Sequence, residues 1–89
     1  MTQEQVVAVA RQALHGGVNE GTVAGLRGQF RGMHLTFCSN EDVINAVPYL
    51  QMPRLNVYLV DGREHCLRLT QDLDAATGLV LAEMSDEEE

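Results

Sequence analysis

Residues 55–70 constrain the fold more than any other stretch, because they have the pattern of two β-strands joined by a tight turn. In residues 55–60 and again in residues 65–70, every second residue belongs to one set of side chains and the residues between them belong to another. This period of two is typical of strands. The dipeptide Asp61-Gly62 between them favours a hairpin turn, because glycine adopts positive φ without steric cost. We therefore predict an antiparallel hairpin around which the other elements pack.

The length of the loop decides which side chains of this hairpin share a face. A loop of odd length pairs Leu59 with His65 and Leu55 with Leu69, whereas a two-residue loop pairs Leu59 with Glu64. We predict the odd loop, because it keeps all the leucines together. The face toward the core then consists of Leu55, Val57, Leu59, His65, Leu67 and Leu69. The opposite face consists of Asn56, Tyr58, Val60, Cys66, Arg68 and Thr70.

Two helices are predicted before the first strand. Thr2 and Gln5 have the spacing of a capping box, which marks the start of a helix. The apolar residues that follow recur at helical spacing and form one stripe: Val6, Val9, Ala10, Ala13 and Leu14. Gly16-Gly17 ends this helix, and Asn19 is the N-cap of a second one. Its buried side is predicted to carry Val23, Leu26 and Phe30.

The remaining segments predict a small sheet with short helices. Residues 33–38 and 79–83 are expected to be strands, and residues 48–53 a connecting loop. Short helical segments are expected around residues 43–47 and over residues 71–77. The order of elements predicts an α+β fold with a mainly antiparallel sheet of about four strands. The N-terminal helix pair and the short helices are expected to pack on one face of this sheet.

Charge and length exclude several classes of protein. The 89 residues carry a net charge of −7, with 13 acidic residues against six basic ones. Residues 1–84 are predicted to form a single domain, and residues 85–89 an acidic, disordered tail. Overall acidity argues against nucleic-acid partners and against anionic membranes. The polar N-terminus lacks the pattern of an export signal, so a cytoplasmic location is expected.

Residues 9–23 resemble a repressor-type helix-turn-helix, in which the second helix reads DNA. Two features argue against DNA reading. The would-be reading helix is rich in glycine and has only Arg27 and Arg31 as cations, and the domain as a whole is acidic. A helical hairpin packed on the sheet is the interpretation that we favour.

A metal or iron–sulfur site is the main chemical alternative, with Cys38, Cys66 and His34 as candidate ligands. His34 and Cys38 share a strand face, but four residues of extended chain separate them by about 13 Å. A shared site therefore requires Cys66 on a neighbouring strand. No paired-cysteine motif, nucleophile elbow or phosphate loop is present in the sequence. We predict no cofactor and no catalytic residues.

An interaction surface is the function that the strand pattern favours. If helices cover the leucine face, the other face carries Tyr58, Val60, Cys66, His34 and Thr36. This face mixes aromatic, β-branched and polar side chains without regular charges, which is typical of a contact surface for a protein partner or a second copy. An ordinary solvent-exposed sheet face is the alternative.

Three segments together resemble a family of small uncharacterised proteobacterial proteins that are often encoded near nitrogen-fixation genes. The segments are VNEGTVAGLR, HLTFCSNEDV and LNVYLVDGREHCLRLTQDLDAATGLVLAE, and the resemblance covers most of the chain except the tail. The family has no assigned activity, so the resemblance implies no catalytic residues. It implies an accessory or partner-binding role near redox metalloenzymes. We therefore expect a small soluble accessory domain that binds protein, with metal or iron–sulfur handling as the alternative.

Overall fold

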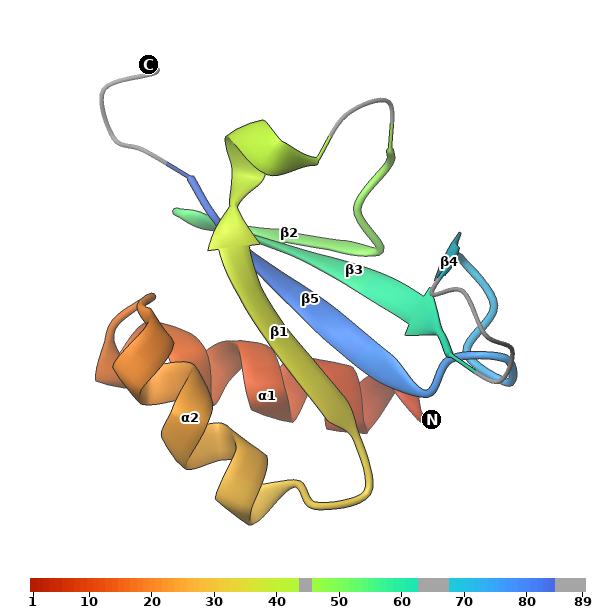
Figure 1. The fold of residues 1–89 in the computed structure, drawn as a ribbon, viewed down its shortest axis with the longest axis horizontal. Helices are drawn as coiled ribbons and strands as arrows, with labels where there is room; N and C mark the ends of the chain where they lie inside the picture. The colour runs from red at the N-terminus through yellow and green to blue at the C-terminus, as the bar shows by residue number, and fades with distance from the viewer. Residues whose placement is uncertain (44–45, 63–67, 85–89) are drawn as a thin grey trace.

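The computed structural model describes residues 1–43, 46–62 and 68–84, which form two α-helices and a five-stranded sheet (Figure 1). The helices α1 (Gln3–Gly16) and α2 (Glu20–Gln29) come first. They are followed by strand β1 (His34–Ser39) and a short 3-10 helix, η1 (Asn40–Asp42). The other strands are β2 (Leu50–Met52), β3 (Leu55–Asp61), β4 (Arg68–Thr70) and β5 (Gly78–Glu83). The α+β class is as predicted.

Local signals placed both helices correctly. The Thr2 hydroxyl accepts a hydrogen bond from the Gln5 main chain, and the Gln5 side chain accepts one from the Thr2 main chain. Gly17 follows α1 with φ of 98°, a conformation that glycine adopts readily. The Asn19 side chain accepts a bond from the Thr22 main chain at 2.9 Å and caps α2. These caps satisfy main-chain groups that have no partner inside the helix.

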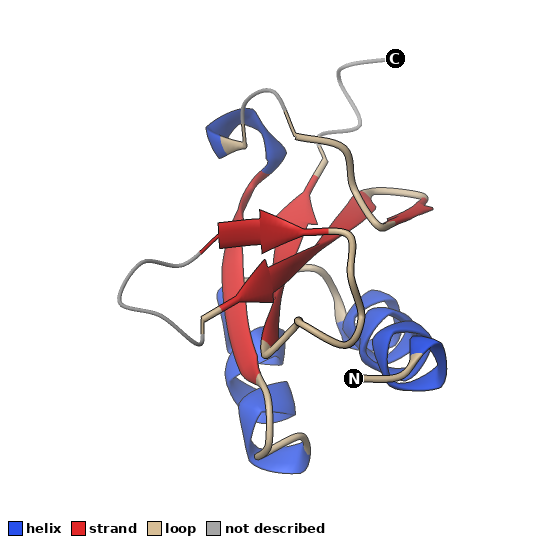
Figure 2. Ribbon diagram, turned by 90° about the vertical axis from the view of Figure 1, so that its right-hand side faces the viewer, coloured by secondary structure: helices blue, strands red, loops and turns tan. Residues whose placement is uncertain are grey.

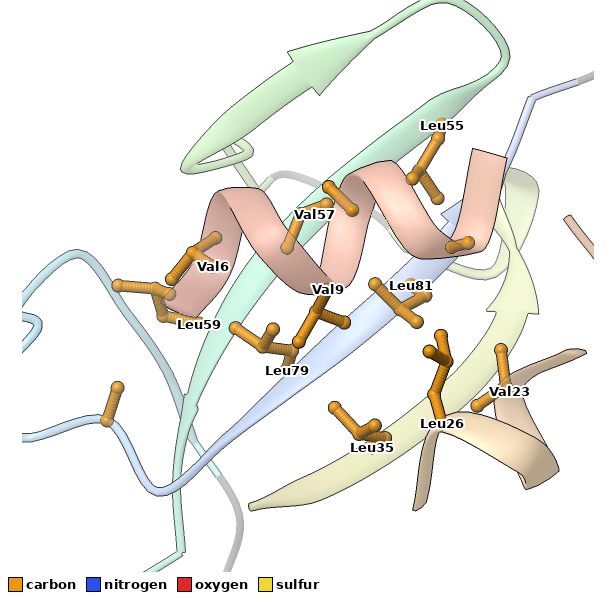
Figure 3. Close-up of a cluster of buried hydrophobic side chains, with 13 residues drawn as sticks. Val6, Val9, Val23, Leu26, Leu35, Leu55, Val57, Leu59, Leu79 and Leu81 are labelled. Atoms are coloured by element: carbon orange, nitrogen blue, oxygen red, sulfur yellow. The ribbon is translucent and has the colours of Figure 1, made fainter. Parts of the chain in front are cut away.

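Both helices pack on one face of the sheet, the face that carries the odd-numbered residues of β1, β3 and β5 (Figures 2 and 3). From the helices, Val6, Val9, Ala10, Ala13, Val23 and Leu26 enter the core. From the sheet, Leu35, Leu55, Val57, Leu59, Leu79 and Leu81 meet them. Full burial of each such aliphatic side chain contributes about 1.5–3 kcal/mol. The predicted leucine face is therefore confirmed for β3, and its position under the helices is the main source of stability.

The sheet is mainly antiparallel, as predicted, but it is mixed: three of its four described pairings are antiparallel, and the pairing of β1 with β5 is parallel. Its order is β1-β5-β3, and β2 and β4 both pair with the far edge of β3. β5 is antiparallel to β3 but parallel to β1, with Leu35 opposite Leu79. Alternation in a sequence defines the two faces of a strand but not its neighbour or its direction, which explains why the parallel pairing was not predicted.

β3 and β4 are antiparallel, as the predicted hairpin requires, but their register differs from the predicted one. Leu59 lies opposite Thr70, and Leu69 lies opposite Val60. Leu69 is therefore on the face away from the helices, where it is 47% exposed. The turn at Asp61-Gly62 does not close a short loop, since β4 begins only at residue 68. The predicted pairing partners His65 and Leu67 lie outside the described residues.

Residues 48–53 contain a strand that the sequence did not predict. β2 pairs with β3 through Met52 opposite Leu55, so that Pro53 and Arg54 make a two-residue turn. Arg54 has φ of 70°, which is the conformation that the third position of a type II turn requires. Proline at the second position fits this turn, but arginine replaces the usual glycine. The three-residue length of β2 makes its alternation too short to detect.

The described residues form neither of the two short helices that we predicted, and residues 44–45 of the first one lie outside the described residues. η1 ends at Asp42, and Val43 is already extended, with φ of −103° and ψ of 113°. In residues 71–77, the main-chain N–H groups of Ala75 and Ala76 donate to the Asp72 carbonyl, which closes one turn only. The Asp72 side chain accepts from the Asp74 main chain at 2.9 Å. Aspartate that bonds nearby main chain in this way favours turns over helices.

Candidate functional site

Four of the five predicted surface residues lie on one face of the sheet, the face away from the helices. One row across the strands joins His34, Gly78 and Val60, and the next joins Thr36, Val80 and Tyr58. The strand registers therefore bring together residues 34, 36, 58 and 60 as predicted. Cys66, the fifth residue of this predicted surface, lies outside the described residues.

Burial divides this face into a covered centre and an open side. Tyr58 is 3% exposed and Val60 is 6% exposed, so neither side chain is presented to a partner. His34 and Thr36 on β1 are exposed. Of the four predicted residues, only His34 and Thr36 on β1 could therefore contact a partner on this face. Tyr58 and Val60 are part of the folded interior.

A polar cluster at the end of β1 anchors the segment that follows it over the sheet. Asn40 Oδ1 accepts hydrogen bonds from Asn56 Nδ2 at 3.1 Å and from the Tyr58 hydroxyl at 3.0 Å. Asn56 is only 5% exposed, and a buried amide without a partner is costly. The cluster is a structural device: it attaches η1 to β3 and thereby holds the end of β1 in place.

The outer edge of β1 is the second feature of this region. The His34 N–H donates to the Thr77 carbonyl at the start of β5, at 3.2 Å. Arg27 Nε, on α2, donates to the Leu35 carbonyl at 2.9 Å. The main-chain N–H and C=O groups of successive strand residues point to opposite edges of the strand. The first bond shows that the groups of His34 point toward β5, and the second that those of Leu35 point away from it. The main-chain groups of Leu35, Phe37 and Ser39 therefore point away from β5, toward the outer edge of the sheet, where no strand of the described residues pairs with β1.

The described residues, 1–43, 46–62 and 68–84, contain no group of three histidine, cysteine or acidic side chains close enough together to hold a metal ion. Cys38 is partly buried and is not in a disulfide. His34 and Cys38 lie four residues apart on β1, and Cys66 falls in the part that is not described. Metal or iron–sulfur binding by these residues stays a prediction, which elemental analysis of the purified chain tests.

One polar depression lies where the start of α1 meets the end of α2, and its polar lining includes Gln5, Gln29, Arg31 and Thr77. Its surface is mainly polar, whereas small-molecule sites are mostly apolar with a few placed polar groups. We therefore assign it no ligand.

A family of unknown function, DUF6129, matches residues 5–84, which include α1 from its third residue onward, all of α2 and the five described strands. The chain belongs to this family. No curated protein and no solved structure shows significant similarity to the chain. Membership of DUF6129 therefore brings no activity and no site residues, and the geometry of the chain carries the functional argument. In the described residues, neither helix is long and apolar enough to cross a membrane.

Sequence reasoning missed the importance of Phe37, Ser39 and Asn40. The strand containing Phe37 was predicted, but it lies at the edge of the sheet because, among the described strands, β1 pairs only with β5. Asn40 had no distinguishing signal, because its two partners come from a strand 16 and 18 residues away. The one available clue was that residues 34–39 contain no charged residue and no proline, which is unusual for an edge strand.

Proposed function

We propose that this protein is a small accessory domain that binds another protein chain through β1. The contact surface consists of the outer main-chain edge of β1 together with the exposed side chains of His34 and Thr36. The observation that carries the proposal is the outer edge of a six-residue strand without a charge or a proline, which no strand of the described residues covers and of which Arg27 occupies the first part only.

Comparison with the opposite side of the sheet supports this choice of edge. There, β2 and β4 share β3 and are three residues long each, so neither offers a long row of main-chain groups. Short edge strands are one of the ways in which proteins avoid unwanted pairing. β1 has no such protection over its second half, and an extended segment of a partner adds to such an edge by main-chain hydrogen bonds.

The fold around β1 makes this surface rigid. Leu35 is 4% exposed and holds the strand to the core, while Tyr58 and the Asn40 side chain hold its far end. A rigid edge loses little conformational freedom when a partner binds, which favours affinity. The expectation of a role near redox metalloenzymes follows from the resemblance alone and stays a prediction.

Capture of partners by the tagged, full-length chain tests the proposal. Thr36→Glu introduces a charge on the exposed face of β1, and charges on edge strands oppose strand addition. We expect this variant to recover at least about tenfold less partner protein from extracts of the source cell, a change of about 1.4 kcal/mol in binding.

Gln12→Glu, on the exposed side of α1, is the matched control, because it adds the same charge far from β1. It is expected to capture partners as the unmodified chain does. Both variants have to melt within a few degrees of the unmodified chain. Equal recovery by Thr36→Glu and Gln12→Glu would show that β1 is ordinary solvent-exposed surface.

A further inference from the structure

We infer that the occupant of the β1 edge is a second copy of this chain, paired antiparallel through residues 37–39 of each copy. The inference rests on the proposed function, since it names the partner of the same edge. It follows from which main-chain groups of β1 are already used, from the charges at the two ends of the strand, and from the two-fold symmetry that identical partners adopt.

Arg27 occupies the first part of the edge. Its Nε donates to the Leu35 carbonyl, and its guanidinium forms an ion pair with Glu20 at 3.3 Å. A partner strand that paired along all of β1 would have to share or displace this contact. The outward groups of Phe37 and Ser39 lie beyond Arg27, and these two residues are the part of the edge that accepts a new strand.

Identical strands that meet at these two residues do so about a two-fold axis, the commonest symmetry of homodimers. In the antiparallel arrangement, Phe37 of each copy exchanges N–H···O bonds with Ser39 of the other. Cys38 lies between them, and its own main-chain groups point back to β5. Cys38 therefore faces Cys38 of the second copy as a non-hydrogen-bonded pair, with about 4.5 Å between Cα atoms.

Charge complementarity favours this arrangement and selects a second copy as the partner. Cationic Arg27 lies beside the first half of β1, and the exposed, anionic Glu41 follows the second half. Antiparallel pairing brings Glu41 of the second copy toward the Arg27 guanidinium, and the contact occurs twice by symmetry. A parallel arrangement brings like ends together and lacks this attraction. Because the same chain carries both the cation, Arg27, and the anion, Glu41, two identical copies are complementary in charge.

Ser39 offers a substitution that blocks the edge and leaves the fold in place. Its φ is −79°, within the range that proline adopts, and its N–H points away from β5. Ser39→Pro therefore removes the outward donor without removing a bond of the β1–β5 ladder. It also loses the 3.4 Å bond that the Ser39 hydroxyl accepts from the Glu41 main chain. Ser39→Ala loses this same bond but keeps the N–H, and is the matched control.

Sedimentation of the purified full-length chain under reducing conditions is the first measurement. We expect a concentration-dependent dimer for the unmodified chain and for Ser39→Ala. Ser39→Pro removes two donors per dimer, and is expected to raise the dimer dissociation constant about thirtyfold. Thermal melting of the two variants within a few degrees of each other shows that both are folded.

Disulfide trapping is the second measurement, made in a Cys66→Ser background so that Cys38 is the one thiol left. The predicted separation of the two Cys38 Cα atoms falls within the range that a disulfide spans. Diamide is therefore expected to link two chains, removing one hydrogen from each thiol and reducing diamide to its hydrazine. Ser39→Ala is expected to cross-link equally, and Ser39→Pro at least about tenfold more slowly.

Three results overturn the inference: a monomer at all concentrations up to about 1 mM, equal dimerisation of Ser39→Pro and Ser39→Ala, or a dimer without cross-linking at Cys38. The proposed function fails separately. If the chain is a monomer but still captures another protein, and Thr36→Glu weakens that capture, then the partner is not a second copy. The proposed binding function of β1 is retained in that case. A monomer without such capture overturns both.

Discussion

Gly78 is the position where the addition of one methyl group tests the sheet most directly. It is the first residue of β5 and lies between His34 on β1 and Val60 on β3. A Cβ atom built on Gly78 lies 2.7 Å from the Cβ of His34 and closer still to the His34 carbonyl oxygen. Ordinary contacts begin at 3.4 Å, so β1 has to move by roughly 1 Å to accommodate alanine.

This movement is expensive because the obstructing atoms belong to the backbone of β1 and not to a flexible side chain. The same site holds the bond from the His34 N–H to the Thr77 carbonyl, at 3.2 Å, which a shift of β1 would stretch. Overpacking of a well-packed site costs about 1–3 kcal/mol, and we expect Gly78→Ala to lie near the upper end. For a domain of this size, a loss of 2–3 kcal/mol lowers the melting temperature by about 10–20 °C.

Urea denaturation and thermal melting measure the effect, and Gly28→Ala in α2 is the matched control. Nothing lies within 4 Å of a Cβ built on Gly28, and alanine favours the helix by up to about 1 kcal/mol. The same substitution is therefore expected to destabilise at Gly78 and to stabilise at Gly28. A melting temperature for Gly78→Ala within about 2 °C of the unmodified chain would refute the close approach of β1 to β5.

Three further predictions concern the loops and the register of the sheet. Asn40→Ala is expected to cost about 2–3 kcal/mol of stability by leaving two nearly buried donors without an acceptor, whereas Tyr58→Phe costs about 1 kcal/mol; equal losses in urea denaturation would contradict the shared acceptor. Arg54→Gly is expected to raise the melting temperature by about 4–8 °C, because glycine relieves the positive φ at the β2–β3 turn, and an unchanged or lower value would argue against this backbone strain. Leu69→Ala is expected to change stability by less than about 0.5 kcal/mol and Leu59→Ala to cost about 2–5 kcal/mol, since the first is 47% exposed and the second fully buried; similar costs would restore the register in which both leucines face the core.

Local chemistry made the helical part of this fold predictable. Thr2 with Gln5, and Asn19 with the following turn, are caps whose partners lie three residues away, so the sequence contains both halves of each interaction. The stripe that begins at Val6 and Val9 likewise reports its own helical period. The strand at residues 79–83 and the inward face of β3 were predicted for the same reason, because alternation is a local property.

Contacts between distant segments decided everything that concerns the candidate site. No local feature shows that β5 separates β1 from β3, that its pairing with β1 is parallel, or that β1 consequently lies at the edge. The burial of Tyr58 and Val60 likewise depends on segments far away in the chain, among them Asn40, which bonds the Tyr58 hydroxyl.

Alternation therefore identified the two faces of β1 and β3 correctly, and named His34, Thr36, Tyr58 and Val60 as one face, but it placed Leu69 of β4 on the wrong face. Tertiary structure alone decided that the β1 side of this face is open and that its β3 side is covered. The physical reason is that a side chain's direction follows from its own backbone, whereas its exposure and the partner of its main-chain groups follow from whichever segments pack beside it.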